Sequence, residues 1–435
     1  MPRRILPILL MLLFFAVSVS PAESVPDFTE YTSGHYQLRT DLGKEFADDG
    51  LAALEAAYET EKDFYGAQPR LKRGNKLVVN CFSTKEKVNA YMAANGGGSV
   101  SKGGIYLYAT REANLFRQPT DAYTRHLLVH ECAHQFLHNS VCRNDGSVPS
   151  WLDEGLAEYF GSHVWDFKEL SVGRTDIVRL NSNNKLRIFK EHLADPNWKF
   201  AHIFSDNWTN NYPDSFGVVH FLISHKSYSR RFMKFVKLIK GRGDTGNPQA
   251  GGRRAFKSIY GHEPHKMEEA LREFYGDIVP RWEVVWNQWD GGGKRIRGFS
   301  DVTGLLVSTT ELKEGSRQSC KLDFIGGRQS KAGFVVGYED TDNFTEIMLV
   351  KDERVKVVYR RAGKWVTGPS AELPAGAKGG GPPTITLNLL ADGRTEIGVN
   401  GAEVLATKLE CGTVGSRWGL FVDATHCDFV EMVSE

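Results

Sequence analysis

Residues 127–137 read LLVHECAHQFL, with His130 and His134 four positions apart inside an apolar run. In an α-helix, residues i and i+4 lie on one face, and the apolar flanks predict a buried amphipathic helix. The two imidazoles can therefore bind one metal ion, and zinc accepts imidazole nitrogens at about 2.0–2.1 Å. Glu131 lies beside that face, where it can take a proton from a metal-bound water.

A third metal ligand is found in the next apolar segment, where residues 151–159 read WLDEGLAEY. Pro149 and Ser150 predict a turn before this segment, and its apolar spacing predicts a helix that packs antiparallel to the first. Glu154 lies twenty residues after His134, which leaves room for a connecting loop. Two histidines and one glutamate with an open position form a catalytic zinc arrangement.

The two segments together resemble the gluzincin metallopeptidases. The HExxH pattern is followed by a stretch similar to the WLNEGFA segment of the M1-family aminopeptidases, with Asp153 in place of the usual Asn. The span from about Phe28 to Asp290 looks like the peptidase MA-like, DUF1570-type proteins. The resemblance implies a zinc metallopeptidase that acts on a peptide or protein substrate.

Five side chains match the family pattern, and the resemblance implies a role for each. His130, His134 and Glu154 are the implied Zn²⁺ ligands, and Glu131 is the implied general base. Glu158, one turn beyond the third ligand, matches a carboxylate that accepts a hydrogen bond from a ligand imidazole and fixes its tautomer. A degenerate site that keeps the helix without the activity is the alternative.

The oxyanion of the tetrahedral intermediate also needs a hydrogen-bond donor. The resemblance implies Tyr212, which precedes a predicted helix, and a purely structural tyrosine is the alternative; His220 and His225 are weaker candidates. The strand predicted at 103–108, GGIYLY, lacks the acidic residue of the GxMEN segment that holds the substrate amino group in the aminopeptidases. Its edge can still bind an extended peptide by backbone pairing.

Three other side chains of the predicted helix are candidates for further ligands. His126 and His138 lie one turn before and after the histidine pair. We predict that they lie at the surface or behind the ligands, because the metzincin spacing for a third histidine is absent. Cys132 lies on the opposite helix face and is predicted to be a core residue.

The first residues read as a targeting segment. Arg3 and Arg4 precede an apolar run at 5–19, and Ser20–Ala22 offers a small-residue cleavage site. Residues 1–22 are therefore predicted to be a secretory signal peptide. The run is shorter than the roughly 20 residues that span a bilayer, and an uncleaved anchor is the alternative. We expect a secreted or periplasmic protein with no other transmembrane segment.

The net charge bears on the class of partner, and the cysteine count bears on disulfides. Lys and Arg number 54 against 53 Asp and Glu, a net charge of +1, which argues against nucleic acid as a partner. The cysteines fall three on each side of the predicted domain boundary, so some thiols stay free or one disulfide crosses it. The six are Cys81, Cys132, Cys142, Cys320, Cys411 and Cys427.

The apolar spacing of the sequence changes from helical to strand-like at residues 291–293, three consecutive glycines, where we predict a domain boundary. Residues 27–290 are predicted to form a gluzincin-like metallopeptidase domain with a small β-sheet lobe, the HExxH helix and a helical lobe. Residues 298–435 contain many short strands and turns, which predict an all-β jelly-roll sandwich. The fold class is therefore α+β. The predicted helical lobe ends with helically spaced packing residues: Trp282, Trp286 and Trp289.

The second half resembles the concanavalin-like jelly rolls, including the laminin-G-like and DUF1080-type sandwiches. The similar stretches are AGFVV at 332–336, GVNG at 398–401 and WGLFV at 418–422. The resemblance implies a glycan or a cell-surface partner as the ligand of this domain. Exposed side chains of Asp340, Asp342, Trp365 or Trp418 would suit a sugar or Ca²⁺ site, and hydrophobic packing and turn chemistry explain these four residues equally well.

Two other functions stay open at this point, because fold does not fix function. The first half of the chain is a catalytically weak or inactive scaffold in one of them, and the β-sandwich binds a glycan or a cell-surface partner. In the other, the zinc site hydrolyses an amide or ester that is not a peptide, since the metal chemistry is the same.

Overall fold

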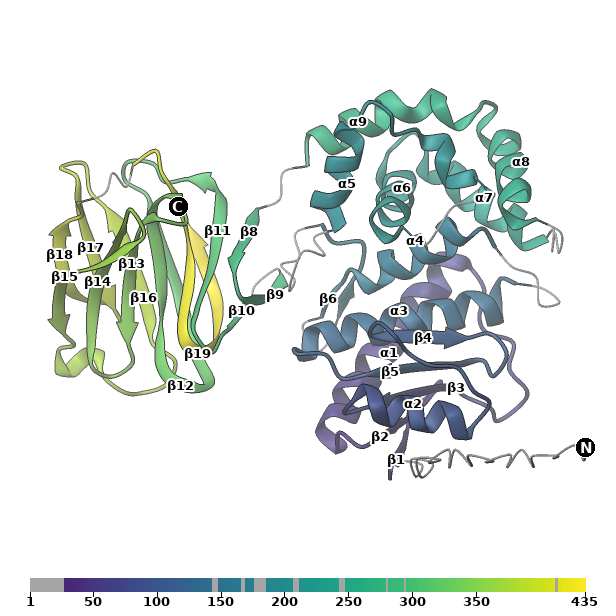
Figure 1. The fold of residues 1–435 in the computed structure, drawn as a ribbon, viewed down its shortest axis with the longest axis horizontal. Coiled ribbons are helices and arrows are strands. Elements are labelled where there is room, and N and C mark those ends of the chain that lie inside the picture. Colours follow the sequence, from purple (N-terminus) through teal and green to yellow (C-terminus); the bar gives the residue numbers. More distant parts are fainter. Residues whose placement is uncertain are drawn as a thin grey trace, which may run out of the picture.

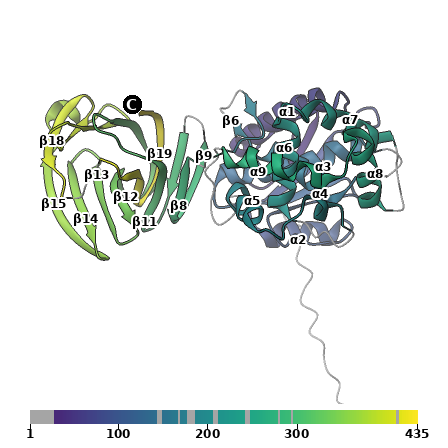
Figure 2. The ribbon, with the colours of Figure 1, turned by 90° about the horizontal axis from the view of Figure 1, so that it is seen from above.

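The computed structural model describes most of the chain after the predicted signal peptide. The described residues are 27–142, 148–165, 169–175, 185–205, 211–241, 247–278, 281–292, 295–410 and 414–435. The predicted signal peptide and Cys411 lie outside them. Figure 1 shows an α/β body and a β-sandwich side by side, and Figure 2 shows the same arrangement from above. Among the described residues, no helix is long and apolar enough to cross a membrane.

A five-stranded sheet lies at the base of the α/β body. Its strands are β1 (Thr29–Thr32), β2 (Tyr36–Thr40), β3 (Leu77–Phe82), β4 (Gly104–Leu107) and β5 (Glu112–Phe116). Their order is β1-β2-β3-β5-β4, with β2, β3 and β5 parallel and β1 and β4 antiparallel at the edges. The central strand β3 reads LVVNCF and is almost entirely buried, as expected for a parallel strand covered by helices.

Four helices pack around this sheet, and two of them confirm the helices predicted from the apolar spacing of residues 127–137 and 151–159. They are α1 (Lys44–Tyr65), α2 (Lys85–Ala94), α3 (Asp121–Ser140) and α4 (Ser150–Gly161). The side chains of Thr84 and Thr120 accept backbone hydrogen bonds at the starts of α2 and α3, so both are N-caps. Nearly every side chain of α3 from Thr124 onward is buried, which matches its apolar flanks.

The helical lobe follows α4 and lies on the far side of it from the sheet (Figure 1). Its helices are α5 (Lys185–Ala194), η1 (Phe200–Phe204), α6 (Tyr212–Ser224), α7 (Ser229–Gly241), α8 (Pro248–Tyr260), η2 (Pro264–Met267) and α9 (Glu268–Gly276), after the short hairpin of β6 (Val164–Trp165) and β7 (Leu170–Ser171). Gly155 lets α6 approach α4 closely, because a Cβ there would lie 2.5 Å from the Ser215 carbonyl oxygen.

The rest of the described chain forms one large antiparallel sheet that folds into a sandwich. Its strands are β8 (Trp282–Trp286), β9 (Gln288–Gly292), β10 (Arg295–Phe299), β11 (Thr303–Glu311), β12 (Arg317–Asp340), β13 (Asn343–Val350), β14 (Arg354–Arg361), β15 (Lys364–Glu372), β16 (Thr384–Leu389), β17 (Arg394–Val399), β18 (Ala402–Lys408) and β19 (Arg417–Ser434), with the short helix η3 (Ala375–Ala377) before β16. The predicted α+β class and the all-β second half are confirmed.

Two long strands, β12 and β19, take part in both layers of the sandwich. Their pairing gives a front layer, β8-β11-β19-β12-β13-β14-β15, and a back layer, β9-β10-β19-β12-β16-β17-β18. Residues 321–325 and residues 333–338 therefore belong to one strand, β12, and lie in different layers. One buried apolar cluster fills the space between the layers and includes Leu322, Phe334, Ile347, Val357, Ile385 and Ile397.

The prediction of a helical segment through residue 290 is wrong. The three tryptophans lie in β8 and β9, and Asn287 between these strands has a left-handed φ of 56°. Two short strands joined at this residue place tryptophans at the spacing of a helix. The predicted 27–290 domain thus contains residues that are hydrogen-bonded in the second sheet. Packing was predicted correctly for Trp282 and Trp289, which are buried.

Candidate metal centre

The neighbouring helices α3 and α4 bring the three predicted metal ligands together. His130 and His134 project from successive turns of α3, and Glu154 reaches them from α4. His130 Nε2 and His134 Nε2 are 3.3 Å apart, and Glu154 Oε2 lies 3.5 Å from each of them. The three donor atoms therefore form a nearly equilateral triangle with both imidazoles buried.

The size of this triangle fits a tetrahedral zinc ion. Bonds of about 2.0–2.1 Å at the tetrahedral angle place ligand atoms about 3.3–3.4 Å apart. The edges of 3.3, 3.5 and 3.5 Å agree with that spacing. Two imidazoles and one carboxylate also form a donor set that zinc prefers, so the residues present fit the predicted cofactor.

A carboxylate lies behind each imidazole of the pair. His134 Nδ1 donates a hydrogen bond to Asp153 Oδ1 at 2.7 Å, and His130 Nδ1 lies 3.4 Å from Glu158 Oε1. Lys185 Nζ lies 2.6 Å from the other oxygen of Glu158. Protonated Nδ1 atoms leave both Nε2 lone pairs free to bind metal. Glu158 therefore lies beside a ligand imidazole, but its contact with His130 Nδ1 is too long to count as the predicted hydrogen bond. Asp153 is a partner that sequence reasoning missed.

The charges around the donor triangle favour ionised groups. Burial opposes protonation of His134, but the carboxylates of Asp153 and Glu154 outweigh burial and hold the pKa of His134 well above its usual value. Burial likewise opposes ionisation of Glu154, but His134 and His130 hold its pKa below the usual range. Burial raises the pKa of the Glu131 carboxyl, which suits a group that must take up a proton near neutral pH.

Glu131 lies directly against the edge strand β4. A Cβ on Gly104 would lie 2.7 Å from Glu131 Oε1, so only glycine lets the strand pass this carboxyl group without displacing it. Tyr108, which follows β4 and is half exposed, donates a hydrogen bond from its hydroxyl to Asp153. The edge of the first sheet is therefore tied to the metal centre through both helices.

Tyr212 is brought to the centre by the start of α6. Its side chain is 37% exposed, and its ring centroid lies 6.2 Å from that of His130. Of the weaker candidates, His220 shares a hydrogen bond of 2.9 Å with the Tyr275 hydroxyl, and burial lowers its pKa to about 4. His225 packs on Tyr228. The position of Tyr212 suits the predicted donor role, which stays a prediction.

His126 and His138 are both buried, so the surface is excluded as one of their two predicted locations, and a place behind the ligands is the other. His126 Nδ1 donates to the Gly161 carbonyl oxygen at 2.5 Å, and His138 shares a hydrogen bond of 2.7 Å with the Tyr106 hydroxyl. Each therefore ties α3 to a neighbouring element. Cys132 is fully buried in the core, as predicted.

A second group of donor atoms involves His126, His130 and Glu158. His126 Nε2 lies 3.6 Å from Glu158 Oε2. The Lys185 ammonium already balances this carboxylate at 2.6 Å. A metal ion there would lie beside the positive charge of Lys185, so the triangle of His130, His134 and Glu154 is the better candidate for a metal site.

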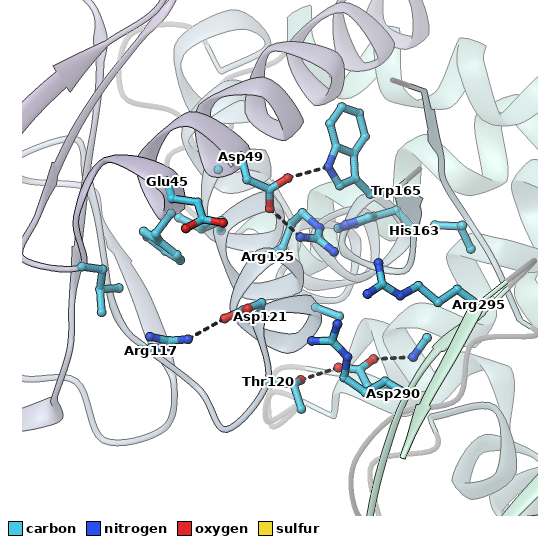
Figure 3. A pocket seen from close by; sticks show the side chains of 18 residues that line it. Glu45, Asp49, Arg117, Thr120, Asp121, Arg125, His163, Trp165, Asp290 and Arg295 are labelled. Atoms are coloured by element: carbon cyan, nitrogen blue, oxygen red, sulfur yellow. Dashed lines mark hydrogen bonds and ion pairs between the residues drawn. The ribbon is translucent and has the colours of Figure 1, made fainter. Parts of the chain in front are cut away.

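A cavity of about 460 Å³ lies away from the candidate metal centre. It lies between α1, the start of α3, β6 and the hairpin of β9 and β10 (Figure 3). Figure 3 shows Asp49 between Arg125 and Trp165, which it contacts at 2.7 and 2.9 Å. Across the cavity, Thr120 donates a hydrogen bond to Asp290. None of the donor-triangle residues lines the cavity, so the cavity and the candidate metal centre are separate features of the structure.

The cysteines of the described residues do not form disulfides. Cys81, Cys132, Cys142, Cys320 and Cys427 are free thiols, and all but Cys142 are buried. The sequence left two alternatives open, free thiols or a disulfide between the domains. In this part of the chain the cysteines are free thiols.

Comparison with known proteins identifies one family segment. Residues 126–242 match the family described as "Protein of unknown function (DUF1570)". The predicted DUF1570-type resemblance is therefore confirmed for this stretch, which contains the donor triangle, Glu131 and Tyr212. No curated protein matches the chain.

Several solved structures show low similarity to parts of this chain. The carbohydrate-binding module CBM66 of Bacillus subtilis is 15% identical, with a TM-score of 0.31, over 36% of this chain and 95% of that one. A GH43 protein of Bacillus licheniformis is 20% identical, with a TM-score of 0.26, over 35% and 36%. Sheep galectin-11 is 10% identical, with a TM-score of 0.25, over 32% and 100%.

Proposed function

We propose that this protein is an exported zinc metallopeptidase that hydrolyses peptide bonds with a metal-activated water. The observation that carries the proposal is the donor triangle of His130, His134 and Glu154, which has the spacing and donor set of a zinc site. The proposed export rests on the signal-peptide pattern of residues 1–22.

The side chains around the triangle divide the chemistry among them. Zinc held there would lower the pKa of a bound water toward about 7. Glu131 accepts a proton from the attacking water and passes it to the leaving amine. Tyr212 donates a hydrogen bond to the carbonyl oxygen as it gains charge. Asp153 and Glu158 hold the two imidazoles in the orientation that metal binding needs.

The edge strand β4 supports a peptide as the substrate. β4 lies at the end of its sheet, pairs with β5 on one side, and passes directly against Glu131. An extended peptide that pairs with the other side would carry its carbonyl groups past the base. Residues 103–108 contain no acidic side chain, so this strand offers no grip for a substrate amino group.

The test is cleavage of a broad peptide library by the zinc-loaded full-length protein. We expect Glu131→Gln to lose about a hundredfold or more in kcat/KM while it retains its zinc, because the variant keeps the side-chain size and lacks the base. Cleavage at the wild-type rate by this variant would contradict the role of Glu131.

Two further outcomes of the same assay separate the alternatives. Hydrolysis of esters or non-peptide amides without any peptide cleavage would favour the broader zinc hydrolase. A zinc-loaded wild-type protein that cleaves neither class would favour an inactive scaffold whose second domain binds a glycan or a cell-surface partner.

A further inference from the structure

The outer face of the front layer carries a cluster of aromatic rings around one arginine. We define this aromatic platform as Trp286 (β8), Phe344 (β13), Arg360 (β14) and Trp365 (β15). The Arg360 guanidinium carbon lies 5.3 Å from the Trp286 ring centroid and 4.9 Å from that of Trp365. Phe344 meets both indoles edge to face, at centroid distances of 5.6 and 5.7 Å. Two indole rings thus stack on one cation, and Phe344 packs against both of them. β8 lies at the opposite end of the front-layer order from β13, β14 and β15, so the platform joins the two ends of that layer.

The platform is rigid because the Arg360 guanidinium makes hydrogen bonds at its edge in addition to the indole contacts on its faces. Its Nε donates to the Thr341 carbonyl oxygen at 2.7 Å, and its Nη2 contacts Asp342 Oδ1 at 3.4 Å. The guanidinium plane is therefore fixed, and it fixes the two indole rings in turn. Trp365 nevertheless remains 46% exposed. An exposed indole held in one orientation is preorganised for stacking on a flat or ring-shaped ligand.

The platform belongs to the outside of the sandwich and not to its core. Side chains alternate along β13, so Phe344, Glu346 and Met348 share the outer face, whereas Ile347 and Leu349 point into the core between the layers. Trp418, the other tryptophan considered for a ligand site, is buried in that core.

The Glu346 carboxyl group lies in the apolar cluster next to the platform. Glu346 is buried opposite Val335 and Val358, which belong to or pack on the small outer cluster that also contains Phe344. Within the described part of the chain its Oε1 has no hydrogen-bond partner, and burial raises the pKa of its carboxyl to about 8. An unsatisfied buried carboxyl group is costly unless something else completes its hydrogen bonds.

The rim of this face presents donors and acceptors in balanced pairs. Arg360 is paired with Asp342, and Arg417 is paired with Glu283 at 2.7 Å and lies over Tyr338 at 5.4 Å. Such a rim has little net charge, so it does not select a strongly charged partner. It offers both hydrogen-bond donors and acceptors beside an apolar ring, which is the combination that a polyhydroxylated ring requires.

We propose that the aromatic platform is a saccharide-binding site, with a sugar ring stacked on Trp365 and its hydroxyl groups bonded to Asp342 and Arg360. The proposal does not rest on zinc hydrolysis, because no residue of the donor triangle takes part. A carbohydrate ligand on this face would hold the α/β body close to a glycan-bearing surface.

The test is binding of the full-length protein to an array of neutral and acidic oligosaccharides. We expect at least one glycan to be bound and Trp365→Ala to weaken that binding by at least about tenfold. Val366→Ala is the matched control, since Val366 is the adjacent exposed apolar residue on the same strand, and it should leave the affinity unchanged. Thermal unfolding checks that both variants are folded.

Three results would overturn the proposal. One is the absence of binding to any glycan of the array, and another is equal affinity of the wild type and Trp365→Ala. The third is binding to protein-coated control spots without sugar that is lost in Trp365→Ala, which would show that the face takes a protein. Titration of intrinsic tryptophan fluorescence with the bound oligosaccharide gives an independent measure of the same affinity.

Discussion

At the scale of single residues, the two imidazoles of the proposed metal centre differ in how closely a carboxylate holds each of them. Asp153 makes a close hydrogen bond of 2.7 Å to His134, whereas Glu158 lies 3.4 Å from His130 and is also balanced by Lys185. Asp153 is further held by the Tyr108 hydroxyl. The orientation of His134 should therefore depend more on its carboxylate than that of His130 does.

This inequality predicts an order of effects on zinc affinity. Asp153→Asn removes the charge that orients His134, so we expect zinc to bind about tenfold more weakly, measured by competition with a chelator. Glu158→Gln should weaken zinc binding less than Asp153→Asn does. The contact of Glu158 with His130 is longer than that of Asp153 with His134, and the Glu158 carboxylate also contacts Lys185. Equal or reversed effects would contradict the assignment of the closer support to Asp153.

The raised pKa of His134 predicts the direction of the pH dependence of metal binding. The folded metal-free protein holds this proton more tightly than an unfolded chain does. The interaction of protonated His134 with the carboxylates of Asp153 and Glu154 therefore stabilises the metal-free fold fully below the usual histidine pKa of about 6.5. This stabilisation is lost as pH rises through the raised pKa of His134. Zinc binds the neutral imidazole, so its affinity should rise over the same interval. A chelator titration at several pH values checks this, and an affinity independent of pH would contradict it.

At the scale of elements, the contact between α4 and α6 sets the distance from Glu154 to Tyr212. Gly155 follows the third ligand directly, and a Cβ there would contact Val219 and lie 2.5 Å from the Ser215 carbonyl oxygen. The glycine of the WLDEG segment is thus a packing requirement of the helix pair rather than a turn signal.

Gly155→Ala should push the two helices apart. We expect the free energy of unfolding to fall by about 1–3 kcal/mol, measured by denaturant unfolding. Gly276→Ala, at the end of α9 with open space around its Cβ position, is the control and should change stability much less. If Gly155→Ala proved as stable as the control, the close approach of α4 and α6 would be contradicted.

Some elements could be predicted from the sequence, and others depend on partners far away in the chain. The i, i+4 histidines predict α3 and the facing imidazoles from local periodicity alone. The contact of Glu154 with them joins two helices, and it was expected from the length of the connecting loop and from the resemblance to the gluzincins. Asp153 was seen only as a departure from the usual Asn. Its role depends on Tyr108, which lies in a different element, and no local pattern reports such a contact.

At the scale of the whole molecule, the α/β body and the sandwich meet at the start of α3, the helix that carries the two histidines of the proposed metal centre. Thr120 caps α3 and also donates a hydrogen bond to Asp290 of β9, which belongs to the sandwich sheet. The strands β8 and β9 were wrongly predicted to be helical, because the two strands are short and Asn287 alone connects them. The tryptophans of the two strands are therefore three and four residues apart, as they would be on one face of a helix. Pairing with β11 and β10 decides their structure, and that long-range information is absent from a local window.

The measurement that tests the central claim most directly is the zinc content of the full-length protein and of Glu154→Ala, determined by elemental analysis. One zinc ion per wild-type chain, lost in the variant while the variant stays folded, is the predicted result. It would establish that His130, His134 and Glu154 together hold the metal. A wild-type chain that takes up no zinc after reconstitution, or a Glu154→Ala variant that retains it in full, would contradict the proposed metal centre.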